Sequence, residues 1–301
     1  MREEPRPVAQ PSPSRPAGLS RTQQVALVGV VCTLPVMWVG ISVVLFTGLK
    51  PAARPTAIAP APSGRDLYAT HCAGCHGIRG DANGPASPFL DPPARYFGME
   101  RFRLACTANG NPNDDDIVYV IRHGIPGSAM PGFPQLSDAD CQGLVTEVRS
   151  RTAFGLSQKL CKSYEAEGGI DGDELSLLVD RLSQPGETVA IPDPFPPAAP
   201  EAVARGRTLY LANCASCHGP DGRGDGPQVK DMKDERGRPT RPRNLANGRY
   251  KGGGTPERLY VRLAVGMPGT PMPASATLKP NEICDLVHYV RSLAAPASDS
   301  P

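Results

Sequence analysis

The sequence contains few aromatic residues and almost no net charge. Phe, Trp and Tyr make up 5% of the 301 residues, which is little for domains that build their core from protein alone. A large bound apolar group would supply the missing mass. The formal net charge is only +2 and no basic stripe stands out, so the sequence gives no support to nucleic-acid binding. The length has room for about two domains, since a domain commonly has roughly 100–200 residues.

Long apolar runs are also scarce, and the longest lies near the N-terminus at 25–49, where no side chain is charged. As a helix this run would reach about 37 Å, enough to cross a hydrocarbon core of about 30 Å. Pro35 would kink such a helix without breaking it. We therefore predict a cytoplasmic tail at 1–24 and a transmembrane anchor at 25–49. The excess of arginine before the run favours this orientation.

A cleaved signal peptide is the alternative for this run, but its apolar stretch would normally span only about 7–15 residues. Under both interpretations, the rest of the chain lies outside the cytoplasm. Residues 50–63 are rich in Pro and Ala, so we expect them to act as a semi-rigid spacer between the membrane and the first domain.

The remaining sequence is a duplication with one fixed offset. A shift of 142 residues maps 64–68 onto 206–210 and 124–131 onto 266–273, and every Gly, Pro and Met of the first copy recurs in the second. A period of this length is that of a small domain plus a connector rather than of a solenoid. The predicted division is a first domain at 64–152, a connector at 153–202, a second domain at 203–296 and a tail at 297–301.

Each domain is predicted to be mostly helical. In the first domain we expect a helix over 64–75, a second that ends at Gly124 and a third that begins after Ser137, a good N-cap. In the second domain, Pro280 is expected at the first position of the last helix. A short helix is expected over 173–183, and the rest of 153–190 receives no role.

Each domain contains one Cys-x-x-Cys-His motif, CAGCH at 72–76 and CASCH at 214–218. This motif is the signature of c-type haem attachment, in which two thiols add across the haem vinyl groups. A redox dithiol would not need the histidine, and zinc would need a second pair of ligands that neither domain offers in parallel. We therefore predict two covalently attached haem c groups. The attaching thiols are those of Cys72, Cys75, Cys214 and Cys217, and the iron ligands are His76 and His218.

One methionine stands in the same Gly/Pro loop of both domains. Met130 and Met272 each lie 54 residues beyond the histidine of their motif. Such a loop can bring a thioether against the open face of a haem, and Met/His ligation raises the reduction potential. We predict these two residues as the sixth ligands, the alternative being apolar fillers. Met267 rivals Met272, but the offset aligns it with Ile125.

The other histidines are expected outside the haem sites. His123 is predicted in a surface or loop position, and His71 and His288 in structural or solvated ones. The second imidazole nitrogen of each ligating histidine needs an acceptor, and the carbonyls of Pro85 and Pro227 are candidates. A plain turn at these prolines is an equal alternative.

Four cysteines remain in or near the two domains. Oxidation outside the cytoplasm permits a Cys141–Cys161 or a Cys106–Cys161 disulfide, and the sequence leaves the pairing open. Cys284 is expected as a buried thiol.

The two domains resemble the class I cytochrome c family in tandem. The resemblance depends on the two motifs with their methionines, on Gly-Asp-Gly-Pro at 224–227 and on the last-helix pattern at 287–291. It implies an all-α fold in which the first and last helices cross, and electron transfer with the haem edge exposed at the cysteine side. The first domain departs from the family in one position, with Asn83 in place of the aspartate. The residues expected at the crossing are Leu67, Tyr68, Leu209 and Tyr210.

Electron transfer without catalysis is the function this predicts. With His and Met on both irons, neither iron has an open position for a substrate. The first hypothesis is a carrier anchored in the bacterial inner membrane, with its haems on the periplasmic side. It would pass single electrons between respiratory partners such as a quinol-oxidising complex, a dehydrogenase or a terminal oxidase.

Two alternatives remain open. The dihaem subunits of some haem–copper oxidases also combine an anchor with two class I domains, so the chain could be a fixed subunit of a terminal oxidase or a periplasmic dehydrogenase. A dihaem peroxidase would need one iron that opens a site for peroxide, and the two candidate methionines argue against it.

Overall fold

The computed structural model describes residues 62–294, which fall in one compact unit. This part of the chain is helical and contains isolated β-bridges but no strand, as predicted. It contains no helix with the length and apolar composition needed to cross a membrane. The predicted anchor at 25–49 lies outside the described residues.

In the first domain, three longer helices enclose the core. These are α2 (Gly64–His71), α4 (Asp114–His123) and α5 (Asp138–Tyr164), with the one-turn α3 (Ala73–His76) directly after α2. Capping boxes begin all three, at Ser63, Asn113 and Ser137. Gly124 ends α4 with φ of 66°, a conformation that glycine adopts without strain.

The second domain repeats this plan. Its helices are α7 (Pro200–Asn213), α8 (Ala215–His218), α9 (Pro256–Val265) and α10 (Pro280–Ser292). Pro256 and Pro280 begin the last two helices, and Gly266 ends α9 with φ of 73°. Short 3-10 turns complete the chain: η1 (Ser87–Phe89), η2 (Glu165–Glu167), η3 (Pro227–Val229) and η4 (Leu245–Asn247).

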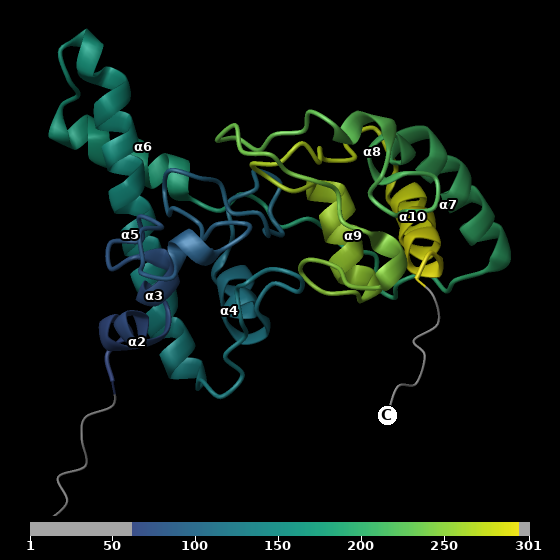
Figure 1. The fold of residues 1–301 in the computed structure, drawn as a ribbon, viewed down its shortest axis with the longest axis horizontal. Coiled ribbons are helices and arrows are strands. Elements are labelled where there is room, and N and C mark those ends of the chain that lie inside the picture. Colours follow the sequence, from purple (N-terminus) through teal and green to yellow (C-terminus); the bar gives the residue numbers. More distant parts are fainter. Residues whose placement is uncertain (1–61, 295–301) are drawn as a thin grey trace, which may run out of the picture. The chain divides into compact units, whose positions relative to one another are not determined.

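The first and last helices of each domain cross at a glycine, as the family resemblance implied (Figure 1). A Cβ on Gly64 would lie 2.3 Å from the carbonyl oxygen of Gly143, and a Cβ on Gly206 would lie 2.0 Å from that of Asp285. Next to these contacts Tyr68 and Tyr210 are fully buried. The absence of a side chain therefore lets the two helix backbones touch.

The connector is more ordered than its composition suggested. The last helix of the first domain continues past residue 152 to Tyr164, and in this extension Gly155 packs directly on the carbonyl of Phe97. The short helix expected at 173–183 is α6 (Gly172–Ser183), which packs back against α5 (Figure 1). Further on, the N–H of Val189 donates to the carbonyl of Cys106 at 2.8 Å.

Candidate functional site

Both Cys-x-x-Cys-His motifs lie at the junction of two helices. Cys72 ends α2 and begins α3, with its N–H donating to the Tyr68 carbonyl at 2.9 Å, and the N–H of His76 returns to the Cys72 carbonyl at 2.9 Å. In the second domain, Cys214 and His218 make the same two bonds at 2.8 Å. The two thiols and the imidazole therefore project from a single helical turn.

Each motif histidine has one ring nitrogen committed to a backbone carbonyl. Nδ1 of His76 lies 3.1 Å from the carbonyl oxygen of Arg95, and Nδ1 of His218 lies 3.3 Å from that of Arg243. A carbonyl only accepts, so Nδ1 carries the hydrogen and Nε2 is left free to bind iron. Burial lowers the pKa of both imidazoles, which favours the neutral form that a metal requires.

The acceptors are not the prolines that the sequence suggested. At 84–85 and 226–227 the chain instead makes close turns against the motif helices. A Cβ on Gly84 would lie 2.3 Å from the Gly74 carbonyl oxygen, and one on Gly226 would lie 2.4 Å from that of Ser216. The turn interpretation of these Gly-Pro pairs is therefore the one that the structure supports.

The loop of Met130 is closed by a serine. The N–H of Ile125 donates to the carbonyl of Met130 at 3.1 Å. The hydroxyl of Ser128 donates to the Ile125 carbonyl at 2.8 Å and accepts from the Met130 N–H at 3.2 Å. These three bonds fix the backbone from which the thioether extends.

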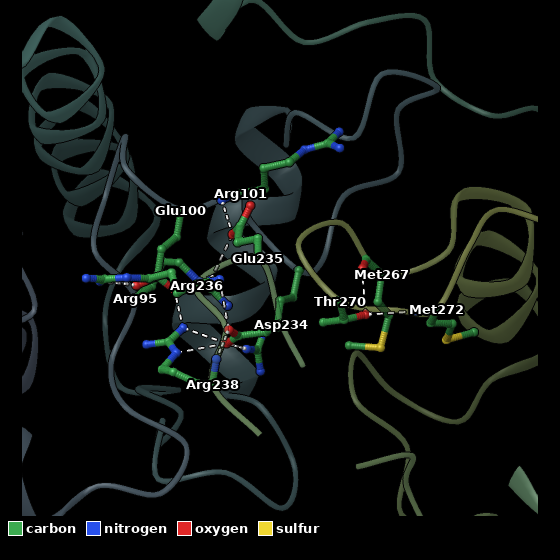
Figure 2. Close-up of polar contacts among 11 residues, drawn as sticks. Arg95, Glu100, Arg101, Asp234, Glu235, Arg236, Arg238, Met267, Thr270 and Met272 are labelled. Carbon is green, nitrogen blue, oxygen red and sulfur yellow. Dashed lines mark hydrogen bonds and ion pairs between the residues drawn. The ribbon is translucent and has the colours of Figure 1, made fainter. Parts of the chain in front are cut away.

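The second domain has the same loop with a threonine (Figure 2). Met267 donates to the Met272 carbonyl at 3.0 Å, and the Thr270 hydroxyl bonds to both residues at 2.7 and 3.3 Å. Met267 thus occupies the place of Ile125, and Met272 that of Met130. This equivalence favours Met272 over its rival, and the ligand assignments themselves stay predictions.

In the first domain the predicted ligand groups line one cavity. Cys72, Cys75, His76 and Met130 all face it. Most of the remaining wall is apolar, and the ring of Phe97 stacks on His76 with the ring centroids 4.8 Å apart. Two thiols, an imidazole and a thioether around an apolar cavity fit haem c. Large apolar side chains in the wall include Phe102, Leu104, Ile117, Ile121 and Phe133.

The two alternatives for the motifs find no support in the described residues. Burial raises the pKa of the Cys72 and Cys214 thiols to about 11, whereas a reactive dithiol needs a lowered pKa. Within 62–294, no group of three or more His, Cys, Asp or Glu side chains gathers as a metal site would require.

Three histidines of the described residues lie outside the Cys-x-x-Cys-His motifs. His123 is exposed and stacks on Tyr119, with centroids 4.2 Å apart. His71 is exposed at the rim of the first cavity, beside Phe133. His288 is only 5% exposed and packs edge-on against Phe195, so its role is structural rather than solvated.

Within residues 62–294, the cysteines outside the motifs are free. Cys141 is buried and Cys161 is exposed, and both belong to α5. Twenty residues of one helix separate them by about 30 Å, far beyond the reach of a disulfide. That pairing is therefore wrong, whereas the buried thiol expected at Cys284 is confirmed.

Sequence reasoning missed a buried ionic cluster that joins the two domains (Figure 2). The carboxylate of Glu100, whose side chain is 1% exposed, contacts Arg95 at 2.5 Å. From the second domain, Arg236 and Arg238 reach it at 3.0 and 2.7 Å. We call the full set the interdomain cluster: Arg95, Glu100, Arg103, Asp234, Glu235, Arg236 and Arg238.

A length difference between the domains produces this cluster. From His76 to its acceptor is 19 residues, but from His218 to its acceptor is 25. The longer segment contains 234–238, which supply the second domain's charges. The segment from the acceptor to the methionine is shorter in the second domain by the same number of residues. The offset of 142 is therefore the same at the motifs and at the methionines, and it concealed both length differences. The lack of matching residues between 85 and 124 was the one available signal.

Two family models match the chain, one over each domain. The model "Cytochrome c" matches residues 203–294, and the model "Cytochrome C oxidase, cbb3-type, subunit III" matches residues 59–146. Together they cover both Cys-x-x-Cys-His motifs and both candidate methionines, Met130 and Met272.

The curated relatives are subunits of cbb3-type cytochrome c oxidases, the enzyme named in the second of these models. The chain is 27% identical over 174 residues to the Cbb3-type cytochrome c oxidase subunit FixP of Bradyrhizobium diazoefficiens, covering 57% of this chain and 56% of that protein. It is 31% identical over 118 residues to the subunit CcoP of Rubrivivax gelatinosus, covering 39% and 32%. The chain thus spans about half the length, or less, of these relatives.

A solved structure is similar over a longer stretch. A chain in the reducing HAO-like protein complex of Kuenenia stuttgartiensis matches with a TM-score of 0.65 and 29% identity, covering 78% of this chain and 97% of that one. The paired motifs, the apolar cavity of the first domain and the two family matches agree. The chain contains two cytochrome c domains with two covalently bound haem c groups, and it is a dihaem cytochrome c.

Proposed function

We propose that this dihaem cytochrome c transfers single electrons as a subunit of a larger oxidoreductase complex. The observation that carries the proposal is the matched site in both domains. Each has a histidine with Nδ1 bound to a carbonyl, and a methionine on a loop closed by the same three hydrogen bonds. When bound, each haem supplies an iron that gains and loses one electron.

The chain's own residues leave no position for a substrate. His76 and Met130, which line one cavity, would occupy both axial positions, and His218 and Met272 would do so in the second domain. Most of the wall of the first cavity is apolar, as the faces of a haem require. Such a site supports electron transfer. The chain is therefore proposed to have no catalytic activity of its own.

The relatives favour a fixed subunit over a free tethered carrier. The named curated relatives are oxidase subunits, and the similar solved structure is a protein complex. A terminal oxidase is therefore one candidate partner. An enzyme complex of another kind is the second, because the match to the HAO-like complex covers 97% of that chain, whereas the oxidase subunits are only half covered.

The proposal includes a topology. Residues 1–24 would be cytoplasmic and 25–49 would anchor the chain in the bacterial inner membrane, followed by the spacer at 50–63. The domains at 64–152 and 203–296 would lie on the periplasmic side, joined by the connector. There they would exchange electrons with the complex and with a donor such as a quinol-oxidising complex or a dehydrogenase.

Purification from native membranes in mild detergent tests this proposal. We expect the chain to remain with an oxidase or dehydrogenase complex through a salt wash and gel filtration. Elution of the dihaem chain by itself would favour the free carrier. Addition of cyanide or peroxide to the oxidised protein tests the peroxidase alternative, and rapid binding to a high-spin haem would support that enzyme instead.

A further inference from the structure

One side chain of the second domain lines the cavity of the first. Among the described residues that face this cavity, Lys251 alone comes from the second domain. It lies in the loop between η4 and α9, and two arginines of the interdomain cluster, Arg95 and Arg103, line the same cavity. Three cations from both domains therefore meet at one haem site.

The backbone around Lys251 is seated on the first domain. Gly252 has φ of 84°, and a Cβ there would lie 3.2 Å from a methyl group of Leu104, which also lines the cavity. Gly253 has φ of 98°, and a Cβ there would lie 2.5 Å from the hydroxyl of Tyr119. The guanidinium of Arg258 covers the Tyr119 ring at 3.6 Å. The loop therefore approaches the first domain too closely for a side chain at position 252 or 253, directly after Lys251.

The charges around Lys251 do not balance. The interdomain cluster contains four arginines and three carboxylates. Lys251 forms no ion pair within residues 62–294. Around the cavity it joins Arg95 and Arg103, and these three cations face one carboxylate of the lining, that of Asp116. Burial, together with Arg103, Arg243 and Arg95, lowers the pKa of Lys251 to about 8. Lys251 is partly buried, and a cation withdrawn from water is costly unless an anion accompanies it.

Haem c brings two anions of its own, the carboxylates of its propionate side chains. They stand at the opposite edge of the macrocycle from the vinyl positions that the two cysteines bind. We propose that Lys251 of the second domain binds a propionate carboxylate of the first domain's haem, beside Arg95 and Arg103. This inference depends on the haem of the first domain and not on the identity of the redox partner.

The consequence is that the second domain tunes the first haem. Reduction adds negative charge to the haem, and a fixed cation favours the reduced form. Lys251 would therefore hold the potential of the first haem above the value that its own domain sets.

Spectroelectrochemical titration of the full two-haem chain tests this in three variants, with a fourth variant, Met130→His, as the marker for the first haem. The first-domain midpoint is identified as the one that Met130→His lowers. Lys251→Gln should lower the same midpoint, by an amount corresponding to on the order of a tenfold fall in the ratio of reduced to oxidised haem. The other midpoint should stay in place. Lys251→Arg should keep the wild-type value, and so should Lys162→Gln, which removes an exposed lysine of α5.

Resonance Raman spectra separate binding from mere proximity. The propionate bending mode should shift in Lys251→Gln and not in Lys251→Arg or Lys162→Gln, because it responds to hydrogen bonding at the carboxylate. Unchanged midpoints in Lys251→Gln would overturn the inference. A lowered midpoint with an unshifted Raman mode would also overturn it, since Lys251 would then act as a nearby charge without binding the carboxylate.

Discussion

The guanidinium of Arg243 donates a hydrogen bond to the carbonyl oxygen of Gly127, 3.1 Å away. Gly127 belongs to the loop that presents Met130, whereas the carbonyl of Arg243 accepts from His218. A Cβ on Gly127 would lie 1.8 Å from a guanidinium nitrogen of Arg243, and the glycine has φ of 70°. One residue of the second domain thus contacts the axial-ligand supports of both haems.

Replacing Arg243 with methionine should loosen the Met130 loop while leaving the carbonyl for His218 in place. The lost hydrogen bond should lower the free energy of unfolding by about 0.5–1.5 kcal/mol. We also expect added imidazole to displace Met130 more readily, as measured by optical titration. Arg249→Met is the matched control, because it makes the same substitution at an exposed arginine of the same domain. Identical behaviour of the two variants would show that the contact with Gly127 has no role.

Replacing Glu100 with glutamine should strongly destabilise the described unit. The change leaves Arg95, Arg236 and Arg238 without their shared carboxylate, and breaking a buried ionic group in this way commonly costs about 3–5 kcal/mol. Chemical denaturation followed by circular dichroism measures the loss. Glu167→Gln, which removes an exposed carboxylate, should change the stability little. Equal stabilities of the two variants would contradict a structural role for the cluster.

The same residue predicts a pH dependence. Burial alone would raise the pKa of Glu100, but the charge of Arg95 and hydrogen bonds from Arg236 and Arg238 lower it below its ordinary value. Its stabilisation is therefore complete above the unfolded pKa of about 4.3, and is lost as the pH falls through the lower folded pKa. The stability difference between wild type and Glu100→Gln should shrink on acidification. A difference that is constant down to about pH 3 would exclude this linkage.

Adding one methyl group at Gly206 should strain the helix crossing of the second domain. The new Cβ would lie 2.0 Å from the carbonyl of Asp285, so α7 and α10 must separate. We expect a loss of about 1–3 kcal/mol, measured by thermal unfolding. In Gly172→Ala the new Cβ meets nothing within 4 Å, and this control should be neutral or slightly stabilising. A tolerated Gly206→Ala would mean that the helices do not touch there.

Much of the fold follows from local signals in the sequence. Ser137 and Gly124 mark helix ends because their capping chemistry acts within a few residues. The repeated Cys-x-x-Cys-His motif identifies the haem attachment in the same local way. The equivalence of Met130 and Met272 follows from comparing two short loops of equal length.

Contacts between segments distant in the chain could not be predicted in this way. Glu100 is bound by arginines more than 130 residues away, and nothing in its local sequence shows this. The acceptors for His76 and His218 were missed because they fall where the two domains differ in length. Lys251 belongs to the second domain by sequence but to the first haem site by position, which only the folded chain reveals.

Axial ligation of both haems by His and Met is the central claim, and the methionine-to-iron charge-transfer band of the oxidised protein measures it most directly. Magnetic circular dichroism of the full chain should show the intensity of two Met-ligated, low-spin haems. Met130→His and Met272→His should each remove half of that intensity and lower one midpoint potential, and the double variant should remove all of it. An unchanged band in either single variant, or a high-spin haem in the resting wild-type protein, would contradict the account.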